Sequence, residues 1–208
     1  MMTATDYESY FANLTDHIFA NLIPDEIGEC YGIGEQSLFI RLNQAKVRQT
    51  TDVEQFSLQL TLFKDGKYLR YAWDLSFDLA QDKEQGARAL RHLRENLAAV
   101  PVDPFLVLPS ATVSHRDVQI LKGSELNRDN REEVISRLCD PLQLMDAVGL
   151  FTSGPMYRFY AHSHGVKSWF ATVVHSMDFS LFNEKQQAVK GNYTDRIWPQ
   201  GDYDARVE

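Results

Sequence analysis

The sequence has little cysteine, no long apolar run and fewer basic than acidic residues. Its 208 residues include 2 cysteines, Cys30 and Cys139, which belong to no CxxC or histidine-rich spacing. A disulfide framework or a zinc ribbon is therefore not expected, and a reducing cytoplasm fits best. No stretch approaches ~18 apolar residues, and acidic residues occupy the N-terminal segment. The sequence therefore predicts neither a membrane-spanning helix nor a signal peptide.

The shortage of basic residues also bears on the partners. The chain has 21 Lys and Arg against 29 Asp and Glu, which gives a formal net charge of -8. Because nucleic acids favour a basic face, a nucleic-acid partner is not expected. The chain does contain 44% hydrophobic residues, and 12% of all residues are aromatic. This composition predicts a globular protein with a sizeable core.

Periodic apolar residues predict three helices. The first carries an apolar stripe from Tyr7 to Leu22, with Thr5 and Glu8 in the form of a capping box and Pro24 as its end. The second covers about residues 78–98, with leucine and alanine on one side and charges on the other. The third begins near Asn130 and stops before Pro141, after which strands are expected.

Strict alternation of apolar and polar residues predicts strands. Residues 55–62 and 69–75 alternate on either side of Asp65-Gly66, a strong tight-turn signal, and should form a hairpin. A short strand is expected over Leu38 to Leu42. The three glycines Gly28, Gly32 and Gly34 lack the setting of a phosphate-binding loop and are interpreted as a flexible turn.

The C-terminal part is rich in β-branched and aromatic residues and predicts long strands. These elements together predict an α+β fold, with a mixed, largely antiparallel sheet of long strands and hairpins packed against two or three helices. The strands are expected over Ala147 to Thr152, Met156 to Ser163 and Val166 to Phe182, with turns at Gly154-Pro155, His164-Gly165 and Asn183-Glu184.

The stretch from Gly154 to Trp169, GPMYRFYAHSHGVKSW, combines aromatic, arginine and histidine side chains. Such a hairpin could present a surface to a peptide or to a partner subunit, although ordinary sheet packing explains the aromatic residues about as well. His162 and His164 form the one close histidine pair of the sequence, but no further ligand lies nearby. Turn-flanking polar residues are therefore favoured over a metal site. His175 falls on the apolar register of its strand and is expected to be a hydrogen-bonded core histidine.

Two segments resemble the TldD/PmbA family. Residues 40–60, IRLNQAKVRQTTDVEQFSLQL, carry the Arg-x-Asn and the following Arg-Gln that recur there, at Arg41, Asn43, Arg48 and Gln49. The hairpin just described and the residues that follow it, up to Trp198, are similar to the stretch that ends the N-terminal half of the family. The match runs through nearly the whole chain and lies more toward the TldE (PmbA) side.

This resemblance implies a subunit of a cytoplasmic, two-subunit zinc metalloprotease that degrades or trims unfolded peptides. In that family the zinc-binding helix lies in the C-terminal half of the TldD-like subunit. The present sequence contains no HExxH or HExxxH motif, so no zinc or other cofactor is expected in this chain, and zinc is expected in a TldD-like partner. Residues 1–208 are expected to form a single N-terminal-type domain, without the C-terminal half of the family.

No catalytic or metal-binding residue is predicted. Arg41 and Arg48 are interpreted as interface or salt-bridging residues, and a long sheet edge could accept an extended peptide as an added strand. Two alternatives stay open: a stand-alone peptide-binding or assembly module without protease activity and, least favoured, a hydrolase that uses the histidine pair. The residues predicted to bind a peptide or the partner subunit are Arg41, Asn43, Arg48, Tyr157, Arg158, Tyr160, His162, His164 and Trp169.

Overall fold

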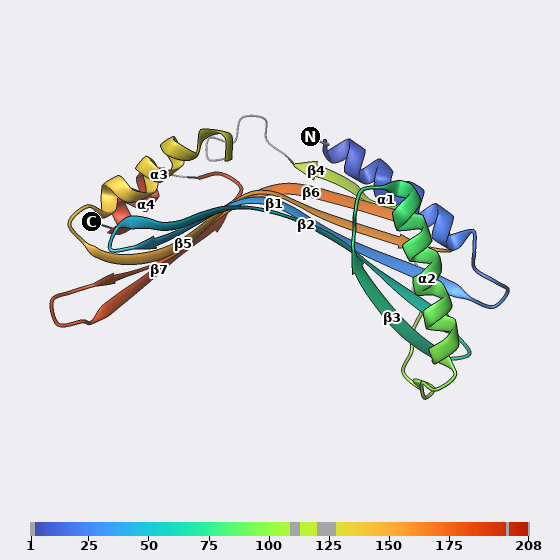
Figure 1. The fold of residues 1–208 in the computed structure, drawn as a ribbon. Coiled ribbons are helices and arrows are strands. Elements are labelled where there is room, and N and C mark those ends of the chain that lie inside the picture. Colours follow the sequence, from blue (N-terminus) through green and yellow to red (C-terminus); the bar gives the residue numbers. More distant parts are fainter. Residues whose placement is uncertain (1–2, 109–112, 120–127, 199, 208) are drawn as a thin grey trace. The chain divides into compact units, whose positions relative to one another are not determined.

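The computed structural model describes residues 3–108, 113–119, 128–198 and 200–207 (Figure 1). Within these ranges the chain has seven strands and four α-helices, so the predicted α+β class is confirmed, with more helices than the two or three expected. The elements are α1 (Ala4–Phe19), β1 (Ile27–Asn43), β2 (Lys46–Lys64), β3 (Lys67–Asp74), α2 (Leu79–Leu97), β4 (Arg116–Gln119), α3 (Arg131–Cys139), β5 (Asp146–His162), β6 (Val166–Phe182), β7 (Ala188–Asp195) and α4 (Gln200–Val207), with short 3-10 turns over Arg128–Asn130 and Asp140–Leu142.

The seven strands form one antiparallel sheet in the order β3-β2-β1-β5-β6-β4, and β7 also pairs with β6. The predicted hairpin is confirmed, because β2 and β3 pair from Ser57 with Asp74 to Lys64 with Lys67. Asp65 and Gly66 connect the two strands with φ angles of 52° and 69°. Glycine and aspartate tolerate this left-handed region well, which explains the tight turn.

The chain divides into two compact units, and the four long strands β1, β2, β5 and β6 contribute residues to both. Unit 1 consists of residues 1–34, 55–118 and 157–171, and unit 2 consists of residues 35–54, 119–156 and 172–208. Each unit has its own helices and its own core. The expectation of a single domain over residues 1–208 stays a prediction.

The first helix of unit 1 begins earlier than its sequence suggests. The capping box is formed by Thr3 and Asp6, so the prediction of Thr5 and Glu8 was wrong by two residues. The Asp6 N–H donates to the Thr3 hydroxyl (3.2 Å), and the Thr3 N–H donates to the Asp6 carboxylate (2.7 Å). Thr3 is extended, with φ -85° and ψ 168°, which is the geometry that lets a side chain cap the first turn.

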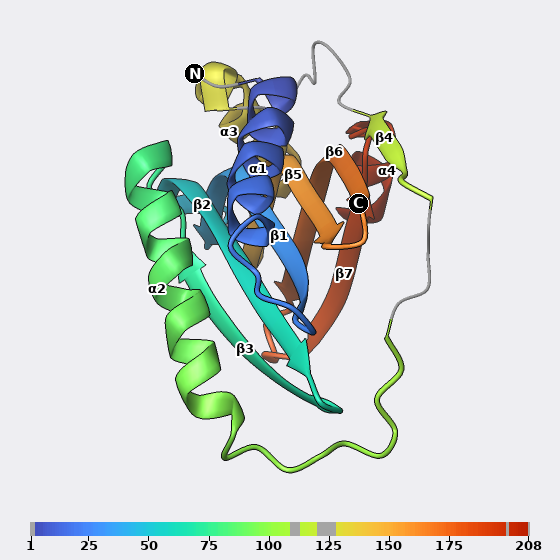
Figure 2. The same cartoon turned by 90° about the vertical axis from the view of Figure 1, so that its right-hand side faces the viewer.

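The core of unit 1 is rich in aromatic residues. Helices α1 and α2 pack against each other, α2 also packs against β3, and Figure 2 shows both helices on one side of the strands β1 to β3. Tyr7 of α1 stacks on Phe56 of β2 with ring centroids 4.4 Å apart, and Phe11 stacks on Phe159 of β5 at 5.3 Å. Because each ring buries a large apolar area, these contacts hold α1 on the sheet.

Glycines in β1 make this close packing possible. Gly28, Gly32 and Gly34 lie inside the strand, so the prediction of a flexible turn was wrong. A Cβ atom on Gly32 would lie 2.4 Å from the Phe11 ring, and one on Gly34 would lie 2.2 Å from the Phe56 ring. The rings occupy the space that side chains would need, which is why three small residues follow each other at spacings of four and two.

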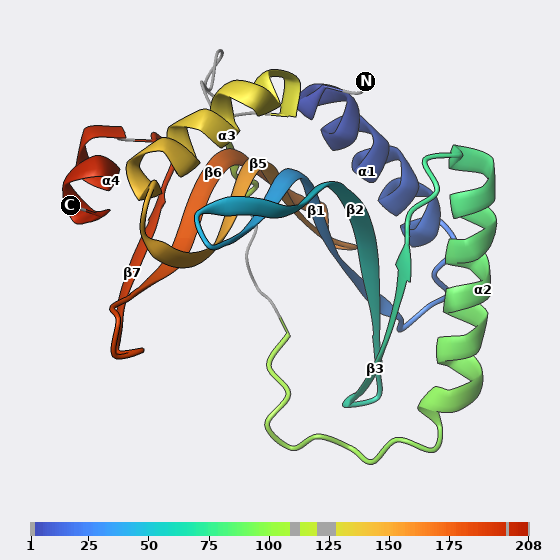
Figure 3. The ribbon, with the colours of Figure 1, turned by 60° about the vertical axis from the view of Figure 1, so that its left-hand side comes forward.

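Unit 2 has a core of its own, to which α3 and α4 contribute buried residues. Figure 3 shows α3 over the strands β5 and β6. Helix α3 starts after Asn130 and ends before Pro141, as predicted, although the Asn130 side chain makes no capping hydrogen bond. Buried residues of both helices pack on β1, β5 and β6, and the cluster includes Leu38, Ile40, Leu42, Val134, Leu138, Phe151, Met177, Phe179, Trp198 and Tyr203.

The predicted break at Gly154-Pro155 is absent, because β5 runs without interruption from Asp146 to His162. A Cβ atom on Gly154 would lie 1.9 Å from the Gln36 carbonyl oxygen of β1. Gly154 therefore serves a close approach of two backbones rather than a turn. The other two turns are confirmed: Gly165, with φ 96°, lies between β5 and β6, and Asn183 starts the connection from β6 to β7.

Candidate functional site

The residues that the sequence predicts for binding fall into two groups with different surroundings. Six of them lie on the hairpin of β5 and β6 in unit 1. Arg41, Asn43 and Arg48 lie on β1 and β2 in unit 2. The two groups therefore belong to different units.

Three of the six hairpin residues are buried. Tyr157, His162 and Trp169 each keep only 3% of their surface exposed. The Tyr157 and Trp169 rings stack with centroids 5.8 Å apart, and Tyr157 also stacks on Phe56 at 5.6 Å. The prediction of an exposed polar-aromatic surface was wrong for these three residues, and sheet packing, the alternative explanation, accounts for the two aromatic rings.

The histidine pair is close but incomplete as a metal site. The rings of His162 and His164 lie 4.7 Å apart, and the backbone N–H of His164 donates to Nδ1 of His162 (3.2 Å). Burial and the neighbouring His164 lower the pKa of His162, against an opposing effect of Glu29. Among the described residues, no group of three or more His, Cys, Asp or Glu side chains could hold a metal ion. The described residues therefore offer zinc no ligand set.

Tyr160 and Arg158 are half-buried, and His164 is exposed. The Tyr160 hydroxyl donates to the Glu29 carboxylate (3.0 Å), and burial together with this carboxylate raises the pKa of Tyr160 to about 12. Arg158 donates to the backbone oxygen of Tyr157 (2.8 Å). These three side chains are the ones of the hairpin group that solvent reaches, so their predicted role in binding stays a prediction.

His175 lies in unit 2 and behaves as predicted. It is 2% exposed, and its Nδ1 lies 2.7 Å from the Ser153 hydroxyl. Burial lowers its pKa, against an opposing effect of Asp195. A neutral, hydrogen-bonded imidazole in the core is a structural feature rather than a ligand.

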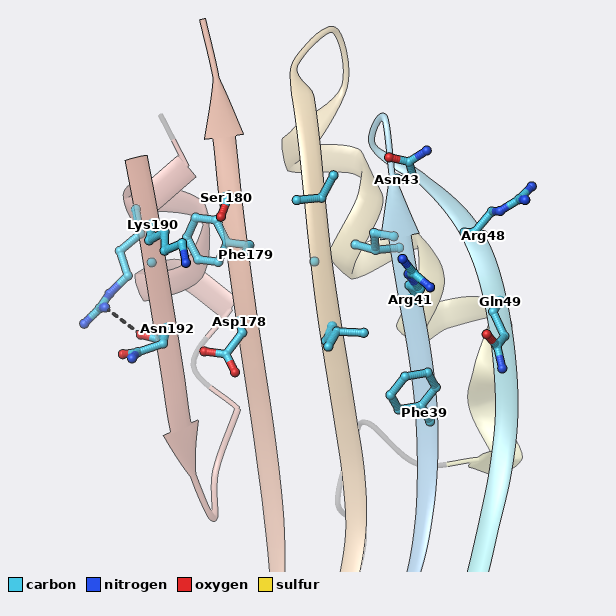
Figure 4. A pocket seen from close by; sticks show the side chains of 16 residues that line it. Phe39, Arg41, Asn43, Arg48, Gln49, Asp178, Phe179, Ser180, Lys190 and Asn192 are labelled. Carbon is cyan, nitrogen blue, oxygen red and sulfur yellow. Dashed lines mark hydrogen bonds between the residues drawn. The ribbon is translucent and has the colours of Figure 1, made fainter. Parts of the chain in front are cut away.

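The second group lines an open hollow of about 1140 Å³ in unit 2. Its residues come from β1, β2, β5, β6, β7 and α4, and Figure 4 shows the side chains spread across the strands. In β1, Leu38, Ile40 and Leu42 are buried in the helix-side core, whereas the alternate residues project to the other face. The hollow is lined by Phe39, Arg41, Leu42, Asn43, Arg48, Gln49, Val148, Gly149, Leu150, Asp178, Phe179, Ser180, Lys190, Gly191, Asn192 and Arg206.

The charges of this hollow are mostly positive. Four cationic side chains and one carboxylate, Asp178, line it. The side chains of Arg41, Arg48 and Lys190 are exposed and form no hydrogen bond or ion pair with any residue that the structure describes. The salt-bridging role considered for Arg41 and Arg48 is therefore not found. Arg206 donates to the backbone oxygen of Asn192 (3.1 Å).

Sequence reasoning assigned no binding role to several residues of the hollow. Lys190 and Asp178 belong to the segments that carry the family resemblance, but they were not connected with Arg41. The signal that could have linked Phe39 to Arg41 and Asn43 is the alternation with the buried leucines and isoleucine of β1. No signal in the sequence brings α4 and β7 to the same place, because this depends on sheet order.

The outer edge of β2 adjoins this site. Strand β3 pairs with β2 only from Ser57 onward. Strand β1 occupies one side of β2. On the other side, over residues 46–53, no strand of the described part of the chain pairs with β2. Such an edge exposes backbone N–H and C=O groups that can pair with another chain. The predicted long sheet edge is therefore present, and in unit 2 it carries Arg48 and Gln49.

None of the helices, over the residues that the structure describes, is long and apolar enough to cross a membrane.

Comparisons with known proteins give structural matches only. No family model matches the chain, and no curated protein matches its sequence. TldE from Thermococcus kodakarensis is similar in structure over 95% of this chain and 46% of its own, with a TM-score of 0.67 and 14% sequence identity.

Two further solved structures are each described as a candidate modulator of DNA gyrase. The one from Thermotoga maritima matches 95% of this chain and 46% of its own, with a TM-score of 0.62 and 11% identity. The one from Bacteroides thetaiotaomicron matches 100% of this chain and 50% of its own, with a TM-score of 0.56 and 14% identity. The chain spans about half the length of each of these proteins. The fold implied by the sequence resemblance is confirmed, since this chain shares it with TldE over nearly all of its residues.

Proposed function

We propose that the chain is the non-catalytic N-terminal portion of a TldE/PmbA-like subunit of a cytoplasmic zinc metalloprotease that degrades or trims unfolded peptides. In this role it contributes peptide and partner-subunit binding, and a TldD-like partner holds the zinc. The observation that carries the proposal is the fold shared with TldE, over 95% of the chain at a TM-score of 0.67. The motifs at Arg41, Asn43, Arg48 and Gln49 support the same assignment from the sequence.

The absence of a metal ligand set among the described residues is compatible with a non-catalytic role, because zinc hydrolysis needs ligands and a base at one place. The free side of β2 over residues 46–53 offers a way to bind unfolded chains. An added strand is held through backbone hydrogen bonds, which every peptide can make, so affinity comes with little sequence preference. A protease subunit that handles unfolded peptides needs this kind of recognition.

Co-expression with a TldD-like subunit tests the proposal. We expect the two chains to co-purify, and we expect cleavage of an unfolded peptide to be faster with this chain than with the TldD-like subunit alone. A peptide with N-methyl groups on alternate residues serves as the matched control, because methylation removes the N–H groups that strand addition uses. If no complex forms and cleavage is the same with and without the chain, the proposal is wrong.

The second candidate is a stand-alone peptide-binding or assembly module without protease activity. It is favoured by one observation: the strand edge and the cationic hollow both lie within unit 2 of this chain. The purified chain should then bind the unmethylated peptide without any partner. Binding that appears only in the presence of a TldD-like subunit would reject this candidate and favour the first.

A further inference from the structure

The hollow of unit 2 concentrates positive charge on an acidic protein. The chain carries a net charge of -8, whereas the lining of the hollow has four cationic side chains to one carboxylate. The four cations come from four separate elements, Arg41 from β1, Arg48 from β2, Lys190 from β7 and Arg206 from α4. Clustering of one sign in a concave site raises the local concentration of ligands of the opposite sign.

None of these cations forms an ion pair with a carboxylate in the described part of the protein. Arg41, Arg48 and Lys190 have no ion pair there, and Arg206 donates only to a backbone oxygen. Cationic side chains elsewhere are paired with carboxylates in several places. Examples are Arg94 with Glu26 (2.7 Å), Arg116 with Glu8 (2.9 Å), Arg131 with Asp52 (2.6 Å), Arg137 with Glu133 (2.6 Å) and Lys167 with Asp16 (2.6 Å).

The arrangement of the cations sets the kind of ligand that can reach them. Figure 4 shows Arg41 and Arg48 toward one side of the hollow and Lys190 toward the other, with β5 and β6 between. Three strand spacings of about 4.8 Å separate β1 from β7, which gives roughly 14 Å. An extended peptide advances about 3.3 Å per residue. Carboxylates about four residues apart on such a peptide therefore match the two sides.

The surface between the cations suits aliphatic side-chain stems. Phe39 and Val148 are half-buried and Leu150 is 44% exposed, all on the lining of the hollow. The side-chain amides of Asn43, Gln49 and Asn192 can donate to peptide carbonyl or carboxylate oxygens. A long polyanion such as a nucleic acid fits less well, because its backbone would continue past the hollow onto a protein that is acidic elsewhere.

We propose that this hollow binds acidic segments of extended peptides, and that Arg41, Arg48 and Lys190 hold the carboxylates. The inference rests on the proposed peptide-binding function and adds a preference for glutamate-bearing or aspartate-bearing substrates. A peptide paired with the free side of β2 runs along the strands, whereas the cations are spread across them, so a peptide that uses both turns at the β2 edge. Asp178 reduces the total positive charge of the hollow, and without this carboxylate the hollow would disfavour basic peptides more strongly.

Two labelled peptides of one length test the proposal by fluorescence anisotropy on the full chain. One carries glutamates four residues apart, and the other carries glutamine at the same positions. We expect the glutamate peptide to bind about tenfold more tightly than the glutamine peptide at low salt, because it can form about two to three ion pairs that the glutamine peptide cannot. Most of this advantage should be lost at about 0.5 M salt, which screens the charges. The double variant Arg41→Gln with Arg48→Gln should bind the glutamate peptide about tenfold more weakly.

The matched control is Lys185→Gln with Arg196→Gln, which removes two exposed cations of unit 2 outside the hollow. This variant should bind both peptides as the unchanged protein does. Equal binding of the two peptides, or an equal loss in the control variant, would overturn the inference. So would a single-stranded oligonucleotide that displaces the label at lower concentration than unlabelled glutamate peptide. If neither peptide binds, the proposed peptide-binding function itself fails, whereas equal binding of both leaves that function standing.

Discussion

The hairpin region of unit 1 and the hollow of unit 2 both combine basic and aromatic residues on long strands, yet these residues have opposite surroundings. In unit 1, Tyr157 and Trp169 stack against each other and are 3% exposed. In unit 2, Arg41 and Arg48 stand exposed and have no partner among the described residues. Residue type alone does not distinguish a core from a binding surface. Which face of the sheet the helices cover decides it, because strand alternation sends neighbouring side chains to opposite faces.

Removal of a large core ring should have the largest effect. Trp169→Ala is expected to lower the free energy of unfolding by about 3–5 kcal/mol, because it leaves a cavity beside Phe11, Tyr157 and Phe159. Chemical denaturation monitored by circular dichroism measures this. Trp169→Phe is the matched control and should cost less, since it keeps a ring. A Trp169→Ala protein of unchanged stability would mean that this residue is not part of the core of unit 1.

The buried carboxylate of Asp82 should come next. It accepts hydrogen bonds from the Tyr10 hydroxyl (2.6 Å), from the backbone N–H of Ser76 (3.1 Å) and from that of Phe77 (3.2 Å). Asp82→Asn places an amide among these donors and is expected to cost about 1.5–3 kcal/mol. Thermal unfolding measures the loss. Tyr10→Phe, which removes one donor, should cost less than Asp82→Asn, and the reverse order would contradict this explanation.

Acidification should weaken both units through buried histidines. Burial lowers the pKa of His175 in unit 2 and of His162 in unit 1 below the ordinary 6.5. The folded state therefore favours the neutral rings. The stability that this preference adds to the folded protein is fully present above pH 6.5 and is lost as pH falls through and below this value.

Urea denaturation between pH 7.5 and pH 5 tests this dependence. Each histidine can contribute a slope of at most about 1.4 kcal/mol per pH unit. His175→Gln should flatten the pH dependence of the free energy of unfolding, and the double variant with His162→Gln should flatten it further. An unchanged slope in both variants would show that neither ring has a lowered pKa in the folded protein.

The smallest effect on stability is expected in the hollow. Arg41→Gln should change the free energy of unfolding by less than about 0.5 kcal/mol, because the side chain is exposed and forms no hydrogen bond or ion pair with the described residues. The same variant should weaken binding of the glutamate peptide. Arg41→Gln should therefore weaken binding without unfolding the protein. Trp169→Ala should weaken binding only to the extent that it lowers the fraction of folded protein. A large loss of stability in Arg41→Gln would break the distinction between the two regions.

Several elements could be predicted because their signals are local. The Asp65-Gly66 turn and its alternating flanks led directly to the β2–β3 hairpin. The apolar period of residues 78–98 led to α2, which spans Leu79–Leu97. The predicted capping box lay two residues from the observed one, because Thr3 and Thr5 are each followed by an acidic residue at the right spacing. The choice between the two threonines depends on where the helix meets the sheet.

Other features could not be predicted, because they depend on contacts between distant segments. Gly154-Pro155 has the composition of a turn, but the close approach of the Gln36 backbone makes it the inside of a 17-residue strand. The glycines of β1 look like a loop until the rings of Phe11 and Phe56 are placed against them. In both cases glycine is suited to a turn and also to a position where another group packs closely against the backbone. Which of the two occurs depends on the segment that packs against the glycine.

The sequence by itself determined the α+β class, the main hairpin, the amphipathic helices and the resemblance to the TldD/PmbA family, because each of these is written in short segments. Tertiary structure alone decided which predicted binding residues are exposed. It buried Tyr157, His162 and Trp169, and it brought Arg41 and Arg48 together with Lys190 and Arg206 from more than 140 residues along the chain. The physical reason is that burial and charge clustering depend on the order of strands and the placement of helices, which involve the whole chain at once.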